Sequence, residues 1–497
     1  MKKTNIMFQG TGSSVGKSII TAGMCRVLKD RGYSVAPFKS QNMALNSFIT
    51  RDGKEMGRAQ VVQAETSKIE PKVEMNPILL KPSSDVGSQV IVMGEVYKNM
   101  TATEYHINKP DFKEIIQKAY RKLSDSYDVI VIEGAGSPAE INLRENDLVN
   151  MGMAEMVDSP VILIGDIDRG GVFASIYGTY MLLEDDEKAR IKGFIINKFR
   201  GDVKLLEPGI KMLEDKINIP CLGVIPYFRL HIDDEDSVSL RFTHQNKKDI
   251  IVGVVRLPHI SNFTDFTPFE MEDDVYIKYI NSVYDFEDVD LLLIPGSKNT
   301  IEDMVYLSNT GISKKILEHH KNNKPIIGIC GGYQILGEEI EDKGNNESNV
   351  LKTNGLGLIN TFTKIAPEKR TVQVEGKVNI EFMGESINTK VKGYEIHMGV
   401  TELRECYHSF ALLNDDKKDG VINHSGNVLG TYMHGIFDND EFRKFILDII
   451  RRNKGIDVKE KQETFEQFKE RQYEELAKIM EDNVNIDGLI KVIESTI

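Results

Sequence analysis

The sequence predicts an α/β protein with two domains, each built around a mainly parallel sheet. Short apolar runs alternate with helical patterns, and strands this apolar are typical of parallel sheets covered on both faces. The chain has 497 residues, too many for one ordinary hydrophobic core. A glycine-rich loop follows the first apolar run, and a cysteine flanked by glycines follows a later one. Each half is therefore expected to carry a site.

The N-terminal half contains a regular series of strand and helix patterns. A helix is predicted at residues 17–30, where apolar residues recur with helical spacing. Strands are predicted at residues 5–8, 34–38, 128–133, 160–166, 191–197 and 221–226. This series predicts a doubly wound sheet in a domain spanning residues 1–235.

A polar, acidic stretch at residues 231–249 indicates a domain boundary. A second α/β series follows, with strands predicted at residues 250–255, 290–295 and 325–329 and alternating patterns at 371–382 and 427–434. It predicts a second domain spanning residues 250–441. Residues 442–497 are helical in pattern and highly charged, and they are expected to form a C-terminal extension that packs on the second domain.

The composition excludes several classes of protein. A formal net charge of −14 argues against a nucleic-acid-binding protein, whose surface is basic. No apolar stretch is long enough to insert into a membrane, and the N-terminus lacks the features of a secretion signal, so a cytoplasmic protein is expected. The four cysteines have no paired spacing, which indicates neither a disulfide framework nor a zinc cluster. The oligomeric state leaves no pattern in the sequence.

Residues 10–18 (GTGSSVGKS) have the composition of a phosphate-binding loop between a strand and a helix. Glycines let backbone N–H groups converge on phosphate oxygens, Lys17 would reach the terminal phosphates, and the Ser18 hydroxyl would bind Mg²⁺. The alternative is a glycine turn that opens an ordinary helix. The residues expected to bind nucleotide here are Gly10, Thr11, Gly12, Gly16, Lys17 and Ser18.

Glu133 ends an apolar strand, so its carboxylate is expected at the sheet edge beside the phosphate loop, where it would bind Mg²⁺ with Ser18. The alternative is a solvated carboxylate. The loop is one residue longer than the commonest form, and with residues 37–42 (PFKSQN) and 132–136 (IEGAG) it resembles the dethiobiotin synthetase branch of phosphate-loop proteins. That resemblance implies nucleotide contacts for Lys39 and Asn197, and activation of a carboxylate as an acyl phosphate.

Cys330 ends an apolar strand and precedes a helical pattern, which predicts a nucleophile on a sharp turn. The N-terminus of the helix would favour the thiolate. The alternative is a small core residue, but core packing gives no evident reason for glycine at positions 328, 331 and 332. His434 follows a strand pattern about a hundred residues later and is the expected base.

Two glycines are the expected oxyanion-hole donors: Gly331, directly after the cysteine, and Gly296, in a turn after another strand. With Cys330 and His434, the second domain resembles a class I glutamine amidotransferase. That resemblance implies attack of the thiol on the glutamine amide and release of ammonia. One position departs from the usual family pattern, because Ile436 stands where a glutamate normally orients the histidine. The orienting group is therefore not identified.

Three aspartates are candidate substrate contacts. Asp147 lies beyond the strand that ends at Glu133, while Asp166 and Asp168 flank the end of the next strand. The alternative for Asp168 is a capping role at the start of the following helix.

A carboxylate-activating domain followed by a glutaminase resembles the corrinoid amidases. Residues 38–46 (FKSQNMALN), 165–174 (GDIDRGGVFA) and 393–399 (GYEIHMG) favour the cobyric acid synthase family. This resemblance implies a corrinoid substrate, glutamine, ATP and Mg²⁺, and amidation of the b, d, e and g carboxylates of adenosylcobyrinic acid a,c-diamide. The alternatives are cobyrinic acid a,c-diamide synthase, a regulatory phosphate-loop ATPase with a degenerate glutaminase domain, and a cysteine hydrolase with an unrelated nucleotide-binding domain.

Overall fold

The computed structural model describes residues 4–84, 87–233, 248–458 and 463–495. The chain forms two compact units. The N-terminal unit contains Met1–Ala44, Glu55–Glu235 and Lys469–Ile497, and the C-terminal unit contains Leu45–Lys54 and Asp236–Phe468. Most of the boundary predicted at residues 231–249 lies outside the described residues. Both units are α/β, as the sequence predicts.

A six-stranded parallel sheet forms the centre of the N-terminal unit, in the order β12-β11-β10-β1-β9-β2. Its strands are β1 (Thr4–Gly10), β2 (Val35–Phe38), β9 (Val129–Glu133), β10 (Val161–Asp166), β11 (Ile191–Phe199) and β12 (Cys221–Pro226). The carboxyl ends of β1, β9 and β10 lie side by side, because β9 and β10 pair with opposite edges of β1. A strand order of this kind places a ligand site at the end of β1.

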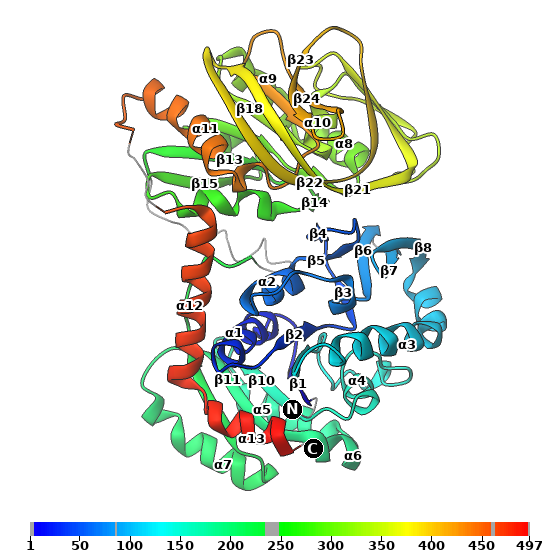
Figure 1. Cartoon of the computed structure of the whole chain (residues 1–497), viewed down its shortest axis with the longest axis vertical. Helices are drawn as coiled ribbons and strands as arrows, with labels where there is room; N and C mark the ends of the chain where they lie inside the picture. Colours follow the sequence, from blue (N-terminus) through cyan, green and yellow to red (C-terminus); the bar gives the residue numbers. More distant parts are fainter. Residues whose placement is uncertain (1–3, 85–86, 234–247, 459–462, 496–497) are drawn as a thin grey trace. The chain divides into compact units, whose positions relative to one another are not determined.

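Helices pack on this sheet in the N-terminal unit (Figure 1). Helix α1 (Lys17–Asp30) contacts β1, β2 and β9, and α5 (Val172–Leu182) contacts β10. The other helices are α2 (Arg58–Thr66), α3 (Ala102–Ser124), α4 (Met151–Met156), α6 (Asp185–Arg190) and α7 (Glu207–Ile217). Strands β1, β2, β9 and β10 are almost entirely buried, which explains why they are apolar along their whole length.

A second, mixed sheet of four strands also belongs to the N-terminal unit and was not predicted. It contains β3 (Gln41–Met43), β6 (Ile78–Ser84), β7 (Gly87–Val92) and β8 (Glu95–Thr101), in the order β3-β6-β7-β8. Strand β8 is mostly exposed, so its sequence lacks the long apolar run of a buried strand.

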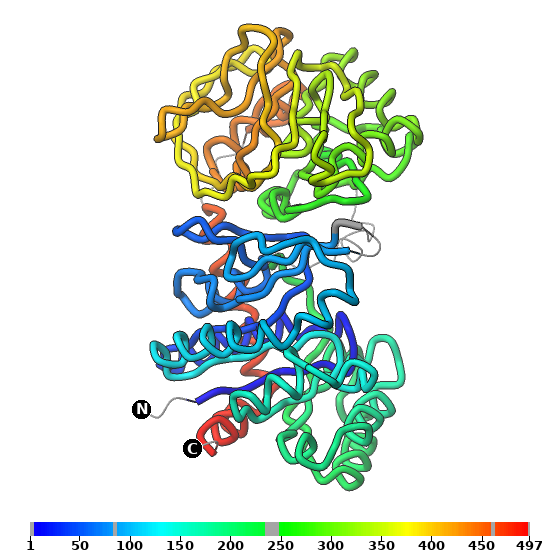
Figure 2. The backbone as a smooth tube through the Cα atoms, turned by 90° about the vertical axis from the view of Figure 1, so that its right-hand side faces the viewer, coloured from blue at the N-terminus to red at the C-terminus, as the bar shows by residue number. Residues whose placement is uncertain are grey.

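The expected packing of residues 442–497 on the second domain is correct up to Phe468 but wrong from Lys469 onward, where most of α12 (Phe465–Asn483) and all of α13 (Ile486–Ser495) pack on the N-terminal unit. Met480 and Leu489 are fully buried in the same core as Ile20 and Met24 of α1. Figure 2 shows this segment in red along the N-terminal unit. The helices are amphipathic rather than uniformly solvated, and their apolar faces complete the core of that unit.

An eleven-stranded sheet forms the centre of the C-terminal unit. Five parallel strands form one side, in the order β15 (Val275–Ile280), β13 (Ile250–Val255), β16 (Leu291–Ile294), β18 (Ile326–Ile329) and β25 (Val428–Thr431). The remaining strands are β19 (Glu339–Glu341), β20 (Lys352–Asn354), β21 (Thr361–Phe382), β22 (Glu385–Leu403), β23 (His408–Leu413) and β24 (Lys418–Ile422). Of the long antiparallel pair β21–β22, the sequence predicted only residues 371–382 of β21 as an alternating pattern, and β22 was not predicted.

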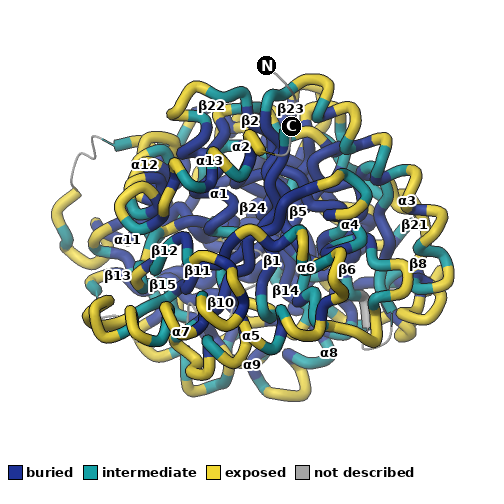
Figure 3. The backbone as a smooth tube through the Cα atoms, turned by 90° about the horizontal axis from the view of Figure 1, so that it is seen from below, coloured by how far each residue is buried: buried dark blue, intermediate teal, exposed yellow. Residues whose placement is uncertain are grey.

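Helices α8 (Thr300–Thr310), α9 (Ile312–Lys321), α10 (Gly331–Leu336) and α11 (Asp440–Asn453) belong to this unit. Short elements follow the parallel strands: β14 (Ile260–Ser261) pairs with β17 (Gly296–Ser297), and the 3-10 helices η5 (Phe263–Met271) and η7 (Ile436–Asp438) lie against each other. Figure 3 shows that buried residues occupy the interior strands, whereas α7 and the surface loops are exposed.

One segment belongs to a different unit from its neighbours in the sequence. Leu45–Lys54, which contains β4 (Ser47–Ile49), follows β3 in the sequence but is part of the C-terminal unit. We call it the insert. No helix among the described residues is both long and apolar enough to cross a membrane.

Candidate active sites

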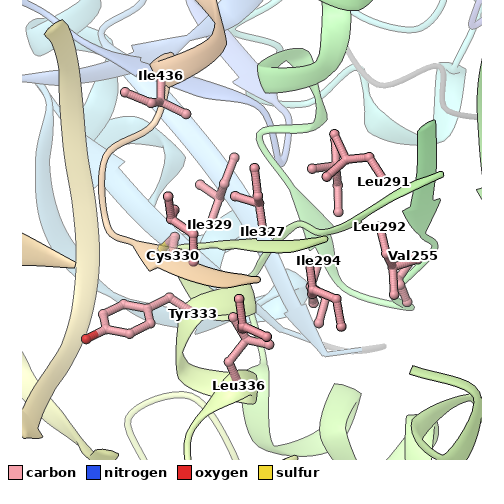
Figure 4. Close-up of a cluster of buried hydrophobic side chains, with 14 of the residues drawn as sticks. Val255, Leu291, Leu292, Ile294, Ile327, Ile329, Cys330, Tyr333, Leu336 and Ile436 are labelled. Carbon is pink, nitrogen blue, oxygen red and sulfur yellow. The ribbon is translucent and has the colours of Figure 1, made fainter. Parts of the chain in front are cut away.

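Cys330 lies on a sharp turn between β18 and α10, as the sequence predicts (Figure 4). Its backbone has φ 52° and ψ −108°, a conformation that non-glycine residues seldom adopt. The turn is held by two hydrogen bonds: the N–H of Cys330 donates to the carbonyl of Thr431 (2.8 Å), and the N–H of Gln334 donates to the carbonyl of Cys330 (3.1 Å). A strained residue held in this way is typical of a functional turn.

The glycines around this turn have a packing role that the sequence analysis did not find. A Cβ on Gly332 would lie 2.0 Å from the carbonyl oxygen of Ile294, and one on Gly328 would lie 2.6 Å from that of Gly332. A Cβ on Gly331 would lie 2.7 Å from the backbone nitrogen of Ser297. Packing alone therefore requires these glycines, and they do not by themselves identify a nucleophile.

His434 and Asp265 form a buried pair. The Nδ1 atom of His434 lies 2.7 Å from Oδ2 of Asp265, and the other carboxylate oxygen accepts the N–H of Gly435 at 2.9 Å. Burial alone would lower the pKa of His434, but the Asp265 carboxylate and the neighbouring Cys330 raise this pKa to about 10. His434 thus contacts both the thiol and a carboxylate, which is the arrangement of a nucleophile, a base and an orienting acid.

Asp265 is the orienting residue that the sequence analysis did not identify. It lies on η5, far upstream of His434 in the sequence. Ile436, where a glutamate was expected, is fully buried in the hydrophobic core around Cys330 (Figure 4). The carboxylate therefore reaches the histidine from another element. The missing glutamate is the only sign in the sequence that such a group is needed, and it does not say where to find it.

The two predicted oxyanion-hole residues lie at the same site. Gly331 is the first residue of α10, directly after the thiol. Gly296 lies in β17, and a Cβ added to it would be 3.2 Å from Cε1 of His434. Their oxyanion role remains a prediction.

The phosphate loop connects β1 to α1, as predicted. Gly16 has φ 102°, and a Cβ there would lie 2.2 Å from the side-chain nitrogen of Asn197, so the position requires glycine. The same nitrogen donates to the carbonyl of Val15 at 2.8 Å. The ammonium of Lys17 donates to the carbonyls of Gly12 and Gly136, each at 3.2 Å. The structure thus brings Lys17 and Asn197 to the loop.

Glu133 is the centre of a buried polar network at this loop. Its carboxylate accepts hydrogen bonds from the Ser18 hydroxyl (2.7 Å), the Lys39 ammonium (3.0 Å) and the Gln63 amide (2.6 Å). Burial would raise the pKa of Glu133, but Lys39 and these donors hold it below its ordinary value. The carboxylate is therefore charged at neutral pH. Gln63, on α2, was not predicted, because a glutamine within a helix gives no local signal.

Ser18 and Glu133 are the residues of this network that would hold a metal ion. Hydroxyl and carboxylate oxygens are the ligands that Mg²⁺ prefers, and Mg²⁺ usually binds through one or two protein ligands plus phosphate oxygens and water. The pair fits such an ion. Within the described part of the chain, no group of three or more His, Cys, Asp or Glu residues is placed to hold a metal by itself.

The three aspartates proposed as substrate contacts each have protein partners. Asp147 accepts the N–H groups of Val149, Asn150 and Gly152, at the start of α4. Asp166 accepts from Lys198 at 2.8 Å, and Asp168 accepts from Arg200 at 2.8 Å. Helix α5 begins after Gly171, with no side-chain cap, so the alternative capping role of Asp168 is wrong. A substrate role for the three remains a prediction.

Comparisons with known proteins agree with this geometry. Residues 6–236 match the CobQ/CobB/MinD/ParA nucleotide binding domain, and residues 251–442 match the CobB/CobQ-like glutamine amidotransferase domain. The whole chain is 52% identical to cobyric acid synthase of Clostridium novyi (strain NT), covering 99% of that protein. The chain belongs to the cobyric acid synthase family.

Other members of the cobyric acid synthase family match almost as closely. The protein of Alkaliphilus metalliredigens (strain QYMF) is 51% identical over 98% of this chain and 99% of its own length. That of Clostridium acetobutylicum is 51% identical over 98% of each chain. The resemblance inferred from sequence segments is thus confirmed at full length. Both matched domains coincide with the halves in which the structure places the phosphate loop and Cys330.

Proposed function

We propose that this chain amidates the b, d, e and g carboxylates of adenosylcobyrinic acid a,c-diamide, using ATP and ammonia from glutamine, to give adenosylcobyric acid in cobalamin biosynthesis. The Cys330–His434–Asp265 arrangement carries the proposal, since a nucleotide-binding domain alone would suit many functions. Full-length similarity to cobyric acid synthases supports this substrate over that of the a,c-diamide synthase. A cytoplasmic location, where ATP and reduced thiols are available, is part of the proposal.

In the glutaminase half, Cys330 would attack the side-chain amide carbon of glutamine. Because the pKa of His434 is raised to about 10, the ring would hold the thiol proton at Nε2 at neutral pH and pass it to the leaving nitrogen, while Asp265 holds the Nδ1–H of the ring. The C–N bond breaks, ammonia leaves and a glutamyl thioester remains. Water, activated by His434, would then release glutamate and restore the thiol. The backbone N–H groups of Gly331 and Gly296 are the proposed donors to the oxyanion.

In the nucleotide half, the phosphate loop would hold ATP while a corrinoid carboxylate attacks its terminal phosphorus. The resulting acyl phosphate has a good leaving group, and ammonia displaces phosphate to form the amide. Lys17 would stabilise the charge that develops on the transferred phosphoryl group. Mg²⁺ held by Ser18 and Glu133 would neutralise phosphate charge when bound. Two alternatives are a regulatory phosphate-loop ATPase with a degenerate glutaminase domain and a cysteine hydrolase with an unrelated nucleotide-binding domain. Each would leave one of the two sites without a function.

The direct test is to incubate the pure chain with the a,c-diamide, ATP, Mg²⁺ and glutamine, and to follow corrinoid mass and glutamate. We expect the product with all of these carboxylates amidated, and glutamate formed in equal amount to the new amides. One site cannot face several sides of a large ring at once, so partly amidated corrinoids should appear free in solution. A time course with excess substrate that contains only starting material and final product would refute this release. Amidation of cobyrinic acid at its a and c positions instead would favour the alternative synthase.

A further inference from the structure

The insert, Leu45–Lys54, forms part of the surroundings of His434. Ser47 donates its backbone N–H to Oδ1 of Asn262 at 3.0 Å, and Asn46 accepts the N–H of Phe263 through its Oδ1 at 3.1 Å. The hydroxyl of Tyr394 donates to the Ser47 carbonyl at 3.2 Å. These contacts lie within the C-terminal unit. The insert therefore reaches the two residues, Asn262 and Tyr394, that flank the histidine.

Asn262 is held in one orientation. It is 2% exposed and has φ 52°, a left-handed conformation that asparagine tolerates better than most residues. Because its oxygen accepts the N–H of Ser47, its amide nitrogen must face the other way. That nitrogen lies 3.5 Å from Nε2 of His434. The orientation of the amide is thus set by the insert.

The ring of His434 is confined on several sides. The titratable groups that face it are Asp265 from η5, at Nδ1, Cys330 from the turn after β18, and Tyr394 from β22. The Tyr394 ring stacks on the imidazole with 5.3 Å between centroids and an angle of 17°. Since Asp265 occupies Nδ1, the proton exchanged with the thiol must be carried at Nε2, which is the atom that Asn262 faces.

We propose that Asn262 is a positioning residue for His434, and that the insert holds it in place. The Asn262 amide points its N–H bonds at Nε2, which favours the neutral ring with a lone pair on that nitrogen. Asp265 favours the opposite, protonated ring. The balance between these two neighbours sets how readily His434 accepts and returns the thiol proton. This inference rests on the proposed glutaminase function.

The insert comes from the N-terminal half of the sequence, although it belongs to the C-terminal unit. The insert begins and ends next to residues of the N-terminal unit in the sequence, Ala44 and Glu55. Asn46 is also the last residue of the FKSQNMALN segment, whose beginning contains Lys39 of the Glu133 network. A segment with residues in both networks is a physical connection through the chain itself. The residues that hold Asn262 therefore come from the N-terminal half of the sequence, although they belong to the C-terminal unit.

The test uses the full-length chain and measures glutamine hydrolysis against pH together with ammonia-driven amidation. We expect Asn262→Ala to lower kcat by about 10- to 100-fold with a smaller change in KM, because a misplaced base slows proton transfer. Loss of the N–H donor stabilises the protonated ring, so the alkaline limb of the pH profile should move up by roughly half a unit. Asn262→Asp should move it further, because a carboxylate stabilises the imidazolium more strongly. Ammonia-driven amidation should persist in both variants.

A matched pair of variants tests the insert itself. Ser47→Pro removes the backbone N–H that holds Asn262 and constrains the backbone at residues 46 and 47, whereas Ser47→Ala retains that N–H, so the difference between them tests whether the backbone of the insert holds Asn262. We expect Ser47→Pro to reproduce the pH shift of Asn262→Ala. Asp52→Ala, at the exposed turn of the insert, is the control and should retain the wild-type profile.

The outcomes separate this inference from the proposed function. If the wild-type chain releases no glutamate from glutamine, the proposed function fails and the inference fails with it. If the wild type is active and both Asn262 variants keep its pH profile, only the inference is wrong. Should Ser47→Pro lose ammonia-driven amidation through misfolding, the two Asn262 variants still decide the question.

Discussion

The two sites differ in how the sequence supplies their residues, although both lie at the carboxyl ends of parallel strands. Residues 10–18 supply a continuous part of the phosphate-loop site, to which Glu133, Lys39, Gln63 and Asn197 are added from other elements. The glutaminase site is assembled from Cys330, His434 and Asp265, which come from three separate elements. Residues of a site that are adjacent in the sequence can be recognised as a motif, whereas residues that come from separate elements can be recognised as one site only in the folded structure.

The largest expected effects test whether the two sites are chemically separate. Cys330→Ser should abolish glutamine-driven amidation and leave ammonia-driven amidation intact, because the weaker nucleophile stops only the release of ammonia. Lys17→Ala should abolish both reactions, because neither can proceed without phosphoryl transfer. Amide formation is measured by corrinoid mass with glutamine or an ammonium salt as nitrogen source.

Cys406→Ser is the control for the thiol variant, because Cys406 is an exposed cysteine of the same unit and should be dispensable. A folded Cys330→Ser chain that also loses the ammonia-driven reaction would contradict the two-site description.

Asp265→Asn tests the residue that completes the assembled site. The amide preserves the size of the side chain but can hold the wrong tautomer of His434, so glutamine hydrolysis should fall by roughly 10²- to 10⁴-fold. Loss of the carboxylate removes the largest of the interactions that raise the pKa of His434 to about 10. The alkaline limb of the glutaminase pH profile should therefore move to lower pH.

This shift is opposite in sign to the one expected for Asn262→Asp, and the two variants together report on both ring nitrogens of His434. Ammonia-driven amidation by Asp265→Asn should match the wild type. A profile with an unchanged alkaline limb would contradict the role of Asp265 as the orienting carboxylate.

The same contrast explains what could be predicted from the sequence. Buried parallel strands are apolar throughout, and a glycine loop or a cysteine turn is a local pattern, so the fold class, the phosphate loop and Cys330 with His434 were predictable. Asp265, Gln63 and Asn262 were not, because each contributes through a contact with a distant element. The residues next to them in the sequence give no indication of these contacts.

Some residues were interpreted wrongly from the sequence because their packing partners could not be predicted. The glycines near Cys330 suggested a nucleophile, but close contacts of α10 with β16, β17 and β18 require them in any case. The charged C-terminal segment was expected to pack on the second domain throughout, yet from Lys469 onward its apolar face belongs to the core of the N-terminal unit. Both errors arise because composition shows polarity and size but not which surface is covered.

The Glu133 network allows the phosphate-loop site to be tested by substitution as well. Lys39→Met leaves a buried carboxylate without its cation and should destabilise the N-terminal unit by about 3 kcal/mol, with loss of ammonia-driven amidation. Because the pKa of Glu133 is held below its ordinary value, its contribution to stability is present at neutral pH and lost as the pH falls below its ordinary range. Urea unfolding at several pH values measures both effects.

The double variant Lys39→Met with Glu133→Gln is the matched control. It removes both charges, so most of the lost stability should return while activity does not. If the double variant were as unstable as Lys39→Met alone, the ion pair would not be the cause.

The smallest expected effect concerns support of the phosphate loop by distant sequence. Met480 of α12 is fully buried against Gly23 of α1, the helix that begins at Lys17. Met480→Ala should lower the free energy of unfolding of the N-terminal unit by about 2–5 kcal/mol through the cavity it leaves, while the kcat of ammonia-driven amidation at 25 °C stays unchanged.

Met212→Ala is the matched control, because Met212 lies on α7 of the same unit but is 54% exposed, so its loss should change stability by less than about 0.5 kcal/mol. Hydrogen exchange of peptides from α1 and β1 would assign the loss to this unit. If Met480→Ala lowered kcat instead of stability, α12 would shape the loop itself, and the phosphate-loop site would depend on distant residues as much as the glutaminase site does.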